Sequence, residues 1–193
     1  MTTAKERPIL FSGPMARAIL DGTKTQTRRV VKPQAAVLTD EMARALGVQP
    51  PAVQSPTVIP CPYGIPGDRL WGRETWAVQH EYDAFPPSAI PASTRWHYAA
   101  TEDLGGLRKR PSIFLPRRGS RILLEITDVR VQRLQEISGP DCWAEGIEFA
   151  GWSCERYGSV VECYRDLWES INGDGSWYAN PWVWAITFRR LQP

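Results

Sequence analysis

The stretch Gly22-Thr23-Lys24-Thr25-Gln26-Thr27-Arg28-Arg29 (residues 22–29) is the densest polar cluster in the 193-residue chain. A short apolar strand over 8–11 and a helix that begins after Ser12 and ends at Gly22 are predicted directly before it. The apolar pair Val30-Val31 follows it. Such a cluster is as typical of a solvated turn as of a binding site, because Lys and Arg prefer the surface. Its position between a helix and an apolar pair favours a partly buried site.

The orientation of these side chains depends on whether the segment is extended. In an extended segment, alternate side chains project to opposite sides. Lys24, Gln26 and Arg28 then share one side, and Thr25, Thr27 and Arg29 share the other. A turn at Lys24 is therefore required to bring Lys24 and Thr27 together, and the segment is either a loop or the start of a strand.

Working outward from this cluster, the pattern predicts mostly short strands. They are expected at 69–78, 96–99, 121–134 and 181–190. Helices are expected from Ser138 to a stop at Gly146 and over 160–171. A change of parity at Thr127-Asp128 indicates a bulge, which barrels use to bend a strand. Short strands and helices in no regular β-α-β order favour an α+β fold, a mixed β-barrel with a few short covering helices.

The chain is expected to form a single domain over 1–193 with two loop insertions. The first, at about 33–66, is rich in Pro, Ala, Val and Gln and contains one weak helical stretch over 40–46. The second covers about 80–95. Hydrophobic residues make up 42% of the chain and charged residues 23%, which is typical of a globular protein. Nine tryptophans indicate rings that fill a β-rich core.

The net charge of +2 does not by itself indicate a polyanion partner. The basic residues nevertheless form three clusters, at 24–32, 108–110 and 117–121. Each cluster on its own fits a solvated face, whereas three in one small domain favour a binding face. The N-terminus lacks the apolar region of a signal peptide, and no apolar run approaches the ~20 residues of a membrane span. A cytoplasmic protein without a membrane partner is expected.

Metal and cofactor motifs are absent from the sequence. The four cysteines form no C-x-x-C pair, and only His80 and His97 accompany them, so no metal site and no cofactor are predicted. Phosphate-cradling glycine motifs and zinc-protease motifs are also absent. The cysteines are expected to be reduced and mostly packed.

The pair Arg73-Glu74 lies between Trp71 and Trp76 in a predicted strand. On a strand, adjacent side chains face opposite ways, and a charge that faces the interior is costly unless it is paired. Whichever of the two faces inward is a site candidate, and Glu74 is favoured. Trp76 is either a core ring or a platform on which an unpaired base stacks.

The cluster at 22–29 resembles the G-x-K-T-x-T-x-R signature of the ASCH (activating signal cointegrator homology) family. Three further segments resemble that family in the same order: Gly67-Asp68-Arg69-Leu70, a segment ending in Glu145-Gly146, and Asn180-Pro181-Trp182 with the strand after it. Together they cover most of the chain and are most similar to the larger bacterial and phage-borne members. The resemblance implies a fold similar to the PUA RNA-binding barrel.

The resemblance also implies an activity. A small ASCH enzyme type removes the acetyl group from N4-acetylcytidine with a Lys, a Thr and a Glu, which resemble Lys24, Thr27 and Glu145 here. In one division of labour, Lys24 is the base for a Thr27 nucleophile, and Glu145 orients the lysine or protonates the leaving amine. In the other, Glu145 is the base and Lys24 stabilises the oxyanion. The sequence does not choose between them.

Other members resemble metal-assisted ribonucleases or non-catalytic RNA-binding modules, and both remain open as alternatives. In a ribonuclease, Lys24, Arg28 and Arg73 neutralise the phosphate, and Glu145 or Glu74 is the general base. In a binding module, the same cations position the nucleic acid. The predicted partner is RNA or a modified nucleoside, with DNA also open. Substrate-binding candidates are Thr25, Arg28, Arg29, Arg73, Glu74 and Trp76.

Overall fold

Two long strands form the centre of the sheet. In the computed structural model, which describes residues 4–32, 34, 60–147 and 157–192, strand β6 (Leu123–Arg133) pairs antiparallel with β7 (Trp182–Leu191). The register of this pair shifts between Ile126 and Asp128, which confirms the predicted bulge. In β6 the buried Leu124 and Ile126 alternate with less buried residues, whereas Val183, Trp184, Ala185 and Ile186 of β7 are all buried. Both faces of that part of β7 are therefore covered, as expected for a central strand.

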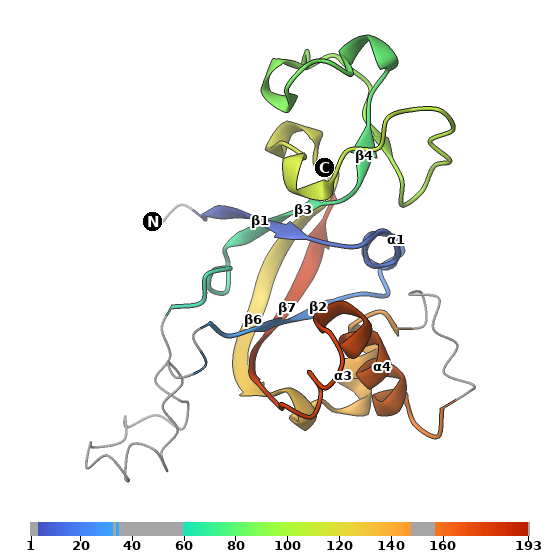
Figure 1. The fold of residues 1–193 in the computed structure, drawn as a ribbon. Helices are drawn as coiled ribbons and strands as arrows, with labels where there is room; N and C mark the ends of the chain where they lie inside the picture. The colour runs from blue at the N-terminus through green and yellow to red at the C-terminus, as the bar shows by residue number, and fades with distance from the viewer. Residues whose placement is uncertain (1–3, 33, 35–59, 148–156, 193) are drawn as a thin grey trace.

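The other three strands complete a mixed five-stranded sheet in the order β1-β3-β6-β7-β2 (Figure 1). Strand β1 (Glu6–Leu10) runs parallel to β3 (Arg69–Arg73), and β2 (Gln26–Val30) runs antiparallel to β7. Among the described residues the strand ladder does not close, so β1 and β2 are its two edges.

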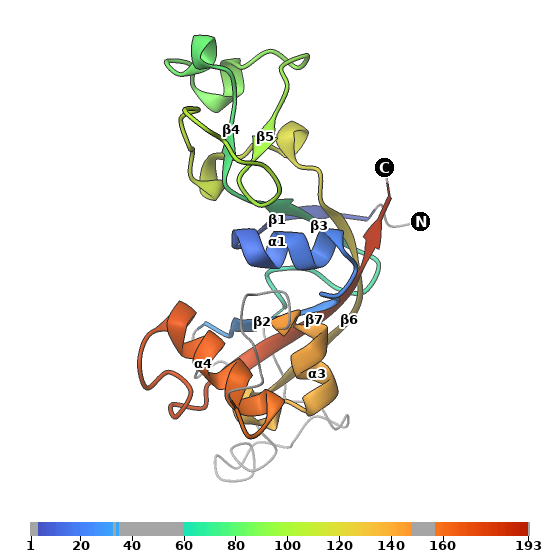
Figure 2. The ribbon, with the colours of Figure 1, turned by 90° about the vertical axis from the view of Figure 1, so that its right-hand side faces the viewer.

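Among the described residues, three helices accompany the sheet, and local signals mark their starts. Helix α1 (Gly13–Leu20) links the two edge strands and lies between them in both views (Figures 1 and 2). Helix α3 (Gly139–Ala144) begins after Ser138, whose hydroxyl accepts a hydrogen bond from the Asp141 N–H. Helix α4 (Val160–Asn172) begins in the same way after Ser159. The helices predicted after Ser12, after Ser138 and over 160–171 are therefore confirmed, and the fold is α+β.

A small lobe follows β3, and in Figure 2 it lies on the other side of α1 from α3 and α4. It contains β4 (Trp76–Ala77), β5 (His97–Tyr98) and four 3-10 turns, η2 (His80–Tyr82), η3 (Pro87–Ala89), η4 (Ser112–Phe114) and η5 (Arg117–Gly119). A further 3-10 turn, η6 (Leu134–Glu136), follows β6. The lobe has its own hydrophobic cluster of Trp76, Val78, Ile90 and Leu115, separate from the main core.

The structure corrects the predicted strand over 69–78. Strand β3 ends at Arg73, and β4 belongs to a separate two-stranded sheet with β5. The break has a physical reason: the buried Glu74 carboxylate pairs with Arg121, and the chain turns there into the lobe. The predicted loop at 80–95 is part of this lobe. The weak helix expected over 40–46 lies outside the described residues, as does most of the insertion at 33–66.

In the described part of the chain, no helix has the length and apolar character needed to cross a membrane.

Candidate functional site

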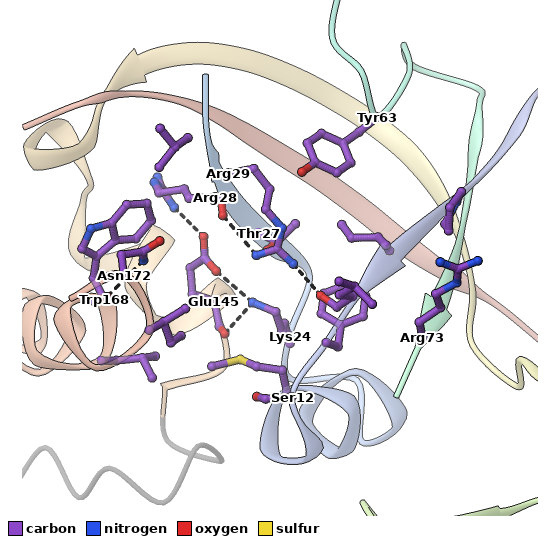
Figure 3. A pocket seen from close by; sticks show the side chains of 18 of the residues that line it. Ser12, Lys24, Thr27, Arg28, Arg29, Tyr63, Arg73, Glu145, Trp168 and Asn172 are labelled. Carbon is purple, nitrogen blue, oxygen red and sulfur yellow. Dashed lines mark hydrogen bonds and ion pairs between the residues drawn. The ribbon is translucent and has the colours of Figure 1, made fainter. Parts of the chain in front are cut away.

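A cavity of about 590 Å³ lies between the two edge strands (Figure 3). One wall is formed by residues 8–10 of β1 and by Phe11, which follows the strand, and another by residues 27–30 of β2. Helix α4 and the residue after α3, Glu145, complete it. A cavity of this size is in the range of small-molecule sites, about 300–1,000 Å³. The opening between β1 and β2 therefore gives the molecule a ligand-sized site.

Lys24 lies in this cavity and is only 3% exposed. Its Nζ donates three hydrogen bonds of 2.8 Å, to the backbone oxygens of Gln26 and Glu145 and to Glu145 Oε2 (Figure 3). Three acceptors require three N–H donors, so the resting lysine is an ammonium ion. Burial lowers the pKa of Lys24 below its ordinary value, and the charge of Glu145 opposes that shift.

Arg28 binds the same glutamate from the other side. Its guanidinium contacts Glu145 Oε1 at 3.1 Å, Asp141 Oδ2 at 3.1 Å and Gln26 Oε1 at 2.6 Å. Burial raises the pKa of Asp141, but the Arg28 charge and the Ser138 hydroxyl outweigh it and leave that pKa below its ordinary value. Two cations, Lys24 and Arg28, thus face two carboxylates, Glu145 and Asp141. We call these four side chains the inner network, and their formal charges cancel.

Local backbone structure brings the inner network together. The N–H groups of Thr23 and Lys24 both bond to the Ala18 oxygen at the end of α1. The turn lies at Asp21-Gly22, directly before these residues, rather than at Lys24 as expected. Gly146, after α3, has φ +77°, and a Cβ there would lie 2.9 Å from Lys24 Cβ. The absence of a side chain at Gly146 therefore lets the end of α3 approach Lys24 closely.

Thr27 lines the cavity from β2 and is 2% exposed. It is paired with Ile186 of β7 in the sheet register, so its position is fixed by the strand. Tyr164 of α4 lines the cavity too, and burial raises the pKa of its hydroxyl well above the ordinary value. Lys24, Thr27 and Glu145 therefore line one cavity, and the roles expected for them stay predictions.

Two more arginines line the cavity without an ion pair. Arg29 donates to the Leu10 oxygen at 2.7 Å and to the Arg28 oxygen at 3.3 Å. Arg73 stacks over the Trp71 ring at 4.6 Å, and its buried Nε has no hydrogen-bond partner. Within the described residues, no carboxylate forms an ion pair with either guanidinium. These two residues add a net positive charge to a cavity whose inner network is neutral.

Three predicted site residues do not line the cavity. Thr25 is exposed, and Trp76 is buried against Trp96 at a ring distance of 5.0 Å in the lobe. Glu74 is 1% exposed but binds Arg121 through both carboxylate oxygens, at 2.9 Å each. Glu74 is the buried member of the Arg73-Glu74 pair, as favoured, but its burial reflects the ion pair with Arg121 and not the site. Arg73 lines the cavity and Glu74 does not.

Sequence reasoning missed several residues of the site. The sequence analysis assigns no role to Asp141, although its spacing of four from Glu145 puts both on one helix face. Gln26 lies inside the polar cluster but was given no role. Tyr63 lines the cavity from the segment before β3, and no sequence signal marked it. In the described ranges, no three His, Cys, Asp or Glu side chains gather so that they could hold a metal ion.

Comparisons with known proteins give little further information. No protein family model matches the chain, and no curated protein sequence matches it. Among solved structures, the chain is similar to the crystal structure of protein EF3133 from Enterococcus faecalis V583, of the family described as DUF984. That match has a TM-score of 0.43 and 9% sequence identity, and covers 99% of this chain and 78% of the other.

Proposed function

We propose that the chain is an ASCH-type protein whose sheet is a partly open, PUA-like barrel. Support comes from where the residues of the signature lie. Lys24, Thr27 and Arg29 of the G-x-K-T-x-T-x-R stretch all line the cavity, and the Glu145 that precedes Gly146 contacts Lys24. The hydrogen bond from Arg29 to the Leu10 oxygen joins the two edges across the opening. These contacts fit a signature that builds a pocket.

We propose further that the protein hydrolyses an amide on a modified nucleobase, of the N4-acetylcytidine type. One observation carries this proposal: Lys24 Nζ lies 2.8 Å from Glu145 Oε2 inside a cavity that Thr27 also lines. A nucleophile, a base and an acid are the groups that amide cleavage through a covalent intermediate requires. Aromatic rings at Phe11 and Trp168 offer apolar surface for a flat base.

The Thr27 hydroxyl needs a base before it can attack. Transfer of a proton from Lys24 Nζ to Glu145 Oε2, along their hydrogen bond, gives a neutral amine and a carboxylic acid. The amine takes the hydroxyl proton as Thr27 Oγ1 bonds to the acyl carbon, and the acid protonates the departing exocyclic amine. Water then cleaves the threonyl ester, releasing acetate and a proton and restoring the hydroxyl. Burial, which lowers the pKa of Lys24, favours the first step.

The test is hydrolysis of N4-acetylcytidine, followed by chromatography and mass spectrometry of cytidine and acetate. Thr27→Val removes the hydroxyl with little change of shape and is expected to lower kcat by at least ~10²-fold, the lower end for loss of such a group. Thr25→Val is the matched control, because Thr25 is exposed and does not line the cavity. Full activity in Thr27→Val would exclude Thr27 as nucleophile.

A second candidate is a binding module that reads RNA without turnover. The observation that favours it is that Lys24 uses all three of its N–H donors within the protein, so its ammonium is already satisfied. Such a module retains single-stranded RNA in a salt-sensitive way and forms no product from any modified nucleoside. The hydrolysis assay, run beside a filter-binding assay at two salt concentrations, separates the two candidates.

A further inference from the structure

The cavity holds more positive charge than its own carboxylates neutralise. The inner network of Lys24, Arg28, Glu145 and Asp141 has no net formal charge. Arg29 and Arg73 line the same cavity and add two positive charges. We infer that Arg29 and Arg73 form a seat for a phosphate group, so that the ligand of the cavity is a nucleotide rather than a free nucleoside. This inference rests on the proposed nucleobase site and names its substrate class.

The end of β1 lies next to both arginine residues. The Arg29 side chain, on β2, donates to the Leu10 oxygen at 2.7 Å. The Arg73 backbone, on β3, pairs with the same stretch, since Leu10 is its register partner and the Phe11 N–H bonds to its oxygen at 2.9 Å. Arg29 thus contacts this stretch through its side chain and Arg73 through its backbone, and both side chains line the cavity. In Figure 3, Arg73 lies at the other end of the cavity from Glu145.

Arg73 differs from the other stacked arginines of the described chain. Arg110, Arg121 and Arg133 each stack on an aromatic ring and also donate to carbonyl or carboxylate oxygens. The Arg73 side chain stacks on Trp71 but has no hydrogen-bond or ion-pair partner within the described residues. Its Nε is buried without an acceptor, as are those of Arg28 and Arg110, but those two guanidinium groups have acceptors at their other nitrogens. An unsatisfied buried donor is costly, so this guanidinium fits a place where a ligand supplies the acceptor.

Donors remain available around this point. A guanidinium has five N–H donors, and Arg29 uses two of its nitrogens on backbone oxygens. The exposed Ser12 hydroxyl lines the cavity and makes no capping bond to α1, which begins at the next residue. The positive end of the helix dipole lies there, which adds to the attraction for an anion. The planar guanidinium fork matches phosphate oxygens in pairs.

The charge also matches a phosphate better than a neutral ligand. A phosphate monoester carries about −1.5 to −2 at pH 7, close to the excess of two cations. A neutral nucleoside would leave both arginines without an opposite charge. With the phosphate at Arg29 and Arg73, the base extends toward Thr27 and the inner network. The seat thus orders the ligand along the cavity.

Calorimetric binding of the four common nucleosides and of their 5′-monophosphates tests this inference. We expect at least one monophosphate to bind wild-type protein about tenfold or more tightly than its nucleoside, as charge-assisted bonds do. Arg73→Gln and Arg29→Gln should each reduce this ratio, and the double variant should bring it near one. Arg69→Gln is the matched control, because Arg69 lies on the same strand and outside the cavity. Thermal melting establishes whether each variant is folded. If Arg29→Gln does not fold, the affinity ratio measured for Arg73→Gln decides the test.

Equal affinity of nucleoside and monophosphate in all four wild-type pairs would overturn the inference, as would a preference that survives in the folded double variant. A dinucleoside monophosphate without a terminal phosphate separates two sources of the group. Weaker binding than the monophosphate identifies a terminal phosphate, whereas equal or tighter binding identifies the RNA backbone. Both results support the seat. Binding is measured without turnover, so the two results are independent. The phosphate seat can be confirmed even if N4-acetylcytidine is not hydrolysed, and hydrolysis can be observed even if the monophosphates show no preference.

Discussion

Glu145 binds both Lys24 and Arg28 in a site with almost no solvent contact. At the scale of single residues, the stability of each buried charge therefore depends on its partners. A buried ion whose partner is removed loses the attraction that offset its desolvation. The same pair has a chemical role in the proposed reaction. Stability and catalysis can therefore be tested with the same substitutions.

Glu145→Gln leaves two buried cations facing one remaining carboxylate, Asp141. We expect it to lower the free energy of unfolding by about 3–5 kcal/mol, the cost of breaking a buried pair. The double variant Glu145→Gln/Lys24→Met should cost less than the sum of the two single changes, because it removes both charges. Urea unfolding measures all three. Glu125→Gln, which breaks the exposed pair with Arg189, is the control and should cost about 1 kcal/mol or less. A Glu145→Gln protein as stable as that control would show that the pair is not needed for the fold.

Asp68 gives a pH-dependent prediction at the same scale. The Lys5 N–H and the Arg7 guanidinium, at 3.0 and 2.7 Å, lower the pKa of its carboxyl below the ordinary 3.8. A lowered folded-state pKa stabilises the protein above pH 3.8, and this contribution is lost as the pH falls through the folded-state value. Asp68→Asn should therefore cost about 1–3 kcal/mol at pH 7. Urea unfolding at pH 7 and pH 3 should show the difference from wild type shrinking at low pH; a constant difference would contradict the ionic explanation.

At the scale of elements, the end of α3 positions the inner network. Gly146 has φ +77°, and a Cβ there would lie 2.9 Å from Lys24 Cβ and 3.0 Å from Ala18 Cβ. Gly22 has a similar φ of +79° but no atom within 4 Å of its Cβ position. Gly22→Ala should cost about 1–2 kcal/mol from backbone strain. Gly146→Ala should cost about 1–3 kcal/mol more from overpacking against the site.

Urea unfolding of the two alanine variants measures this difference, and N4-acetylcytidine hydrolysis measures its effect on the site. Gly146→Ala is expected to lower activity because it displaces Lys24. Gly22→Ala is expected to leave activity unchanged, because it only strains the backbone at a position away from other atoms. Equal stability losses in the two variants would mean that the end of α3 shifts away from Lys24 without cost.

The elements also show what could be predicted from the sequence. The start signal at Ser138 predicts α3, and apolar residues at helical spacing over 160–171 predict α4, because both signals act over a few residues. Alternation predicts β6 and its bulge for the same reason. The sequence does not decide whether β2 is a loop or a strand, since its partner β7 is far along the chain.

For the candidate site, the resemblance predicted Lys24, Thr27 and Glu145, and the structure brings them into one cavity. It did not predict that Asp141 and Gln26 complete their hydrogen bonds, because those contacts depend on how α3 docks on β2. Trp76 shows the reverse error: an aromatic residue near a site candidate turned out to fill the separate core of the lobe. Composition indicates that rings are buried, but not in which cluster.

At the scale of the whole molecule, Arg121 is one of the residues that connect the lobe to the sheet. Arg121, just before β6, binds both carboxylate oxygens of the buried Glu74 and stacks over Tyr98 of the lobe at 4.0 Å. It also donates to the Thr101 hydroxyl at 2.9 Å. Ile113 of the lobe lines the cavity, so this junction also positions part of the cavity wall.

Arg121→Met should therefore loosen the lobe more than the sheet. It leaves the Glu74 carboxylate buried without its cation and removes the contacts to Tyr98 and Thr101. Hydrogen exchange followed by mass spectrometry should show faster exchange at residues 76–119, while the β6–β7 ladder stays protected. Arg189→Met breaks an exposed bidentate pair on β7 and is the control. If exchange rises equally in the lobe and in the ladder, the two parts unfold as one unit. If exchange rises in the lobe alone, the inner network keeps all its contacts. A loss of nucleotide affinity in Arg121→Met then measures how much the cavity wall formed by the lobe contributes to binding.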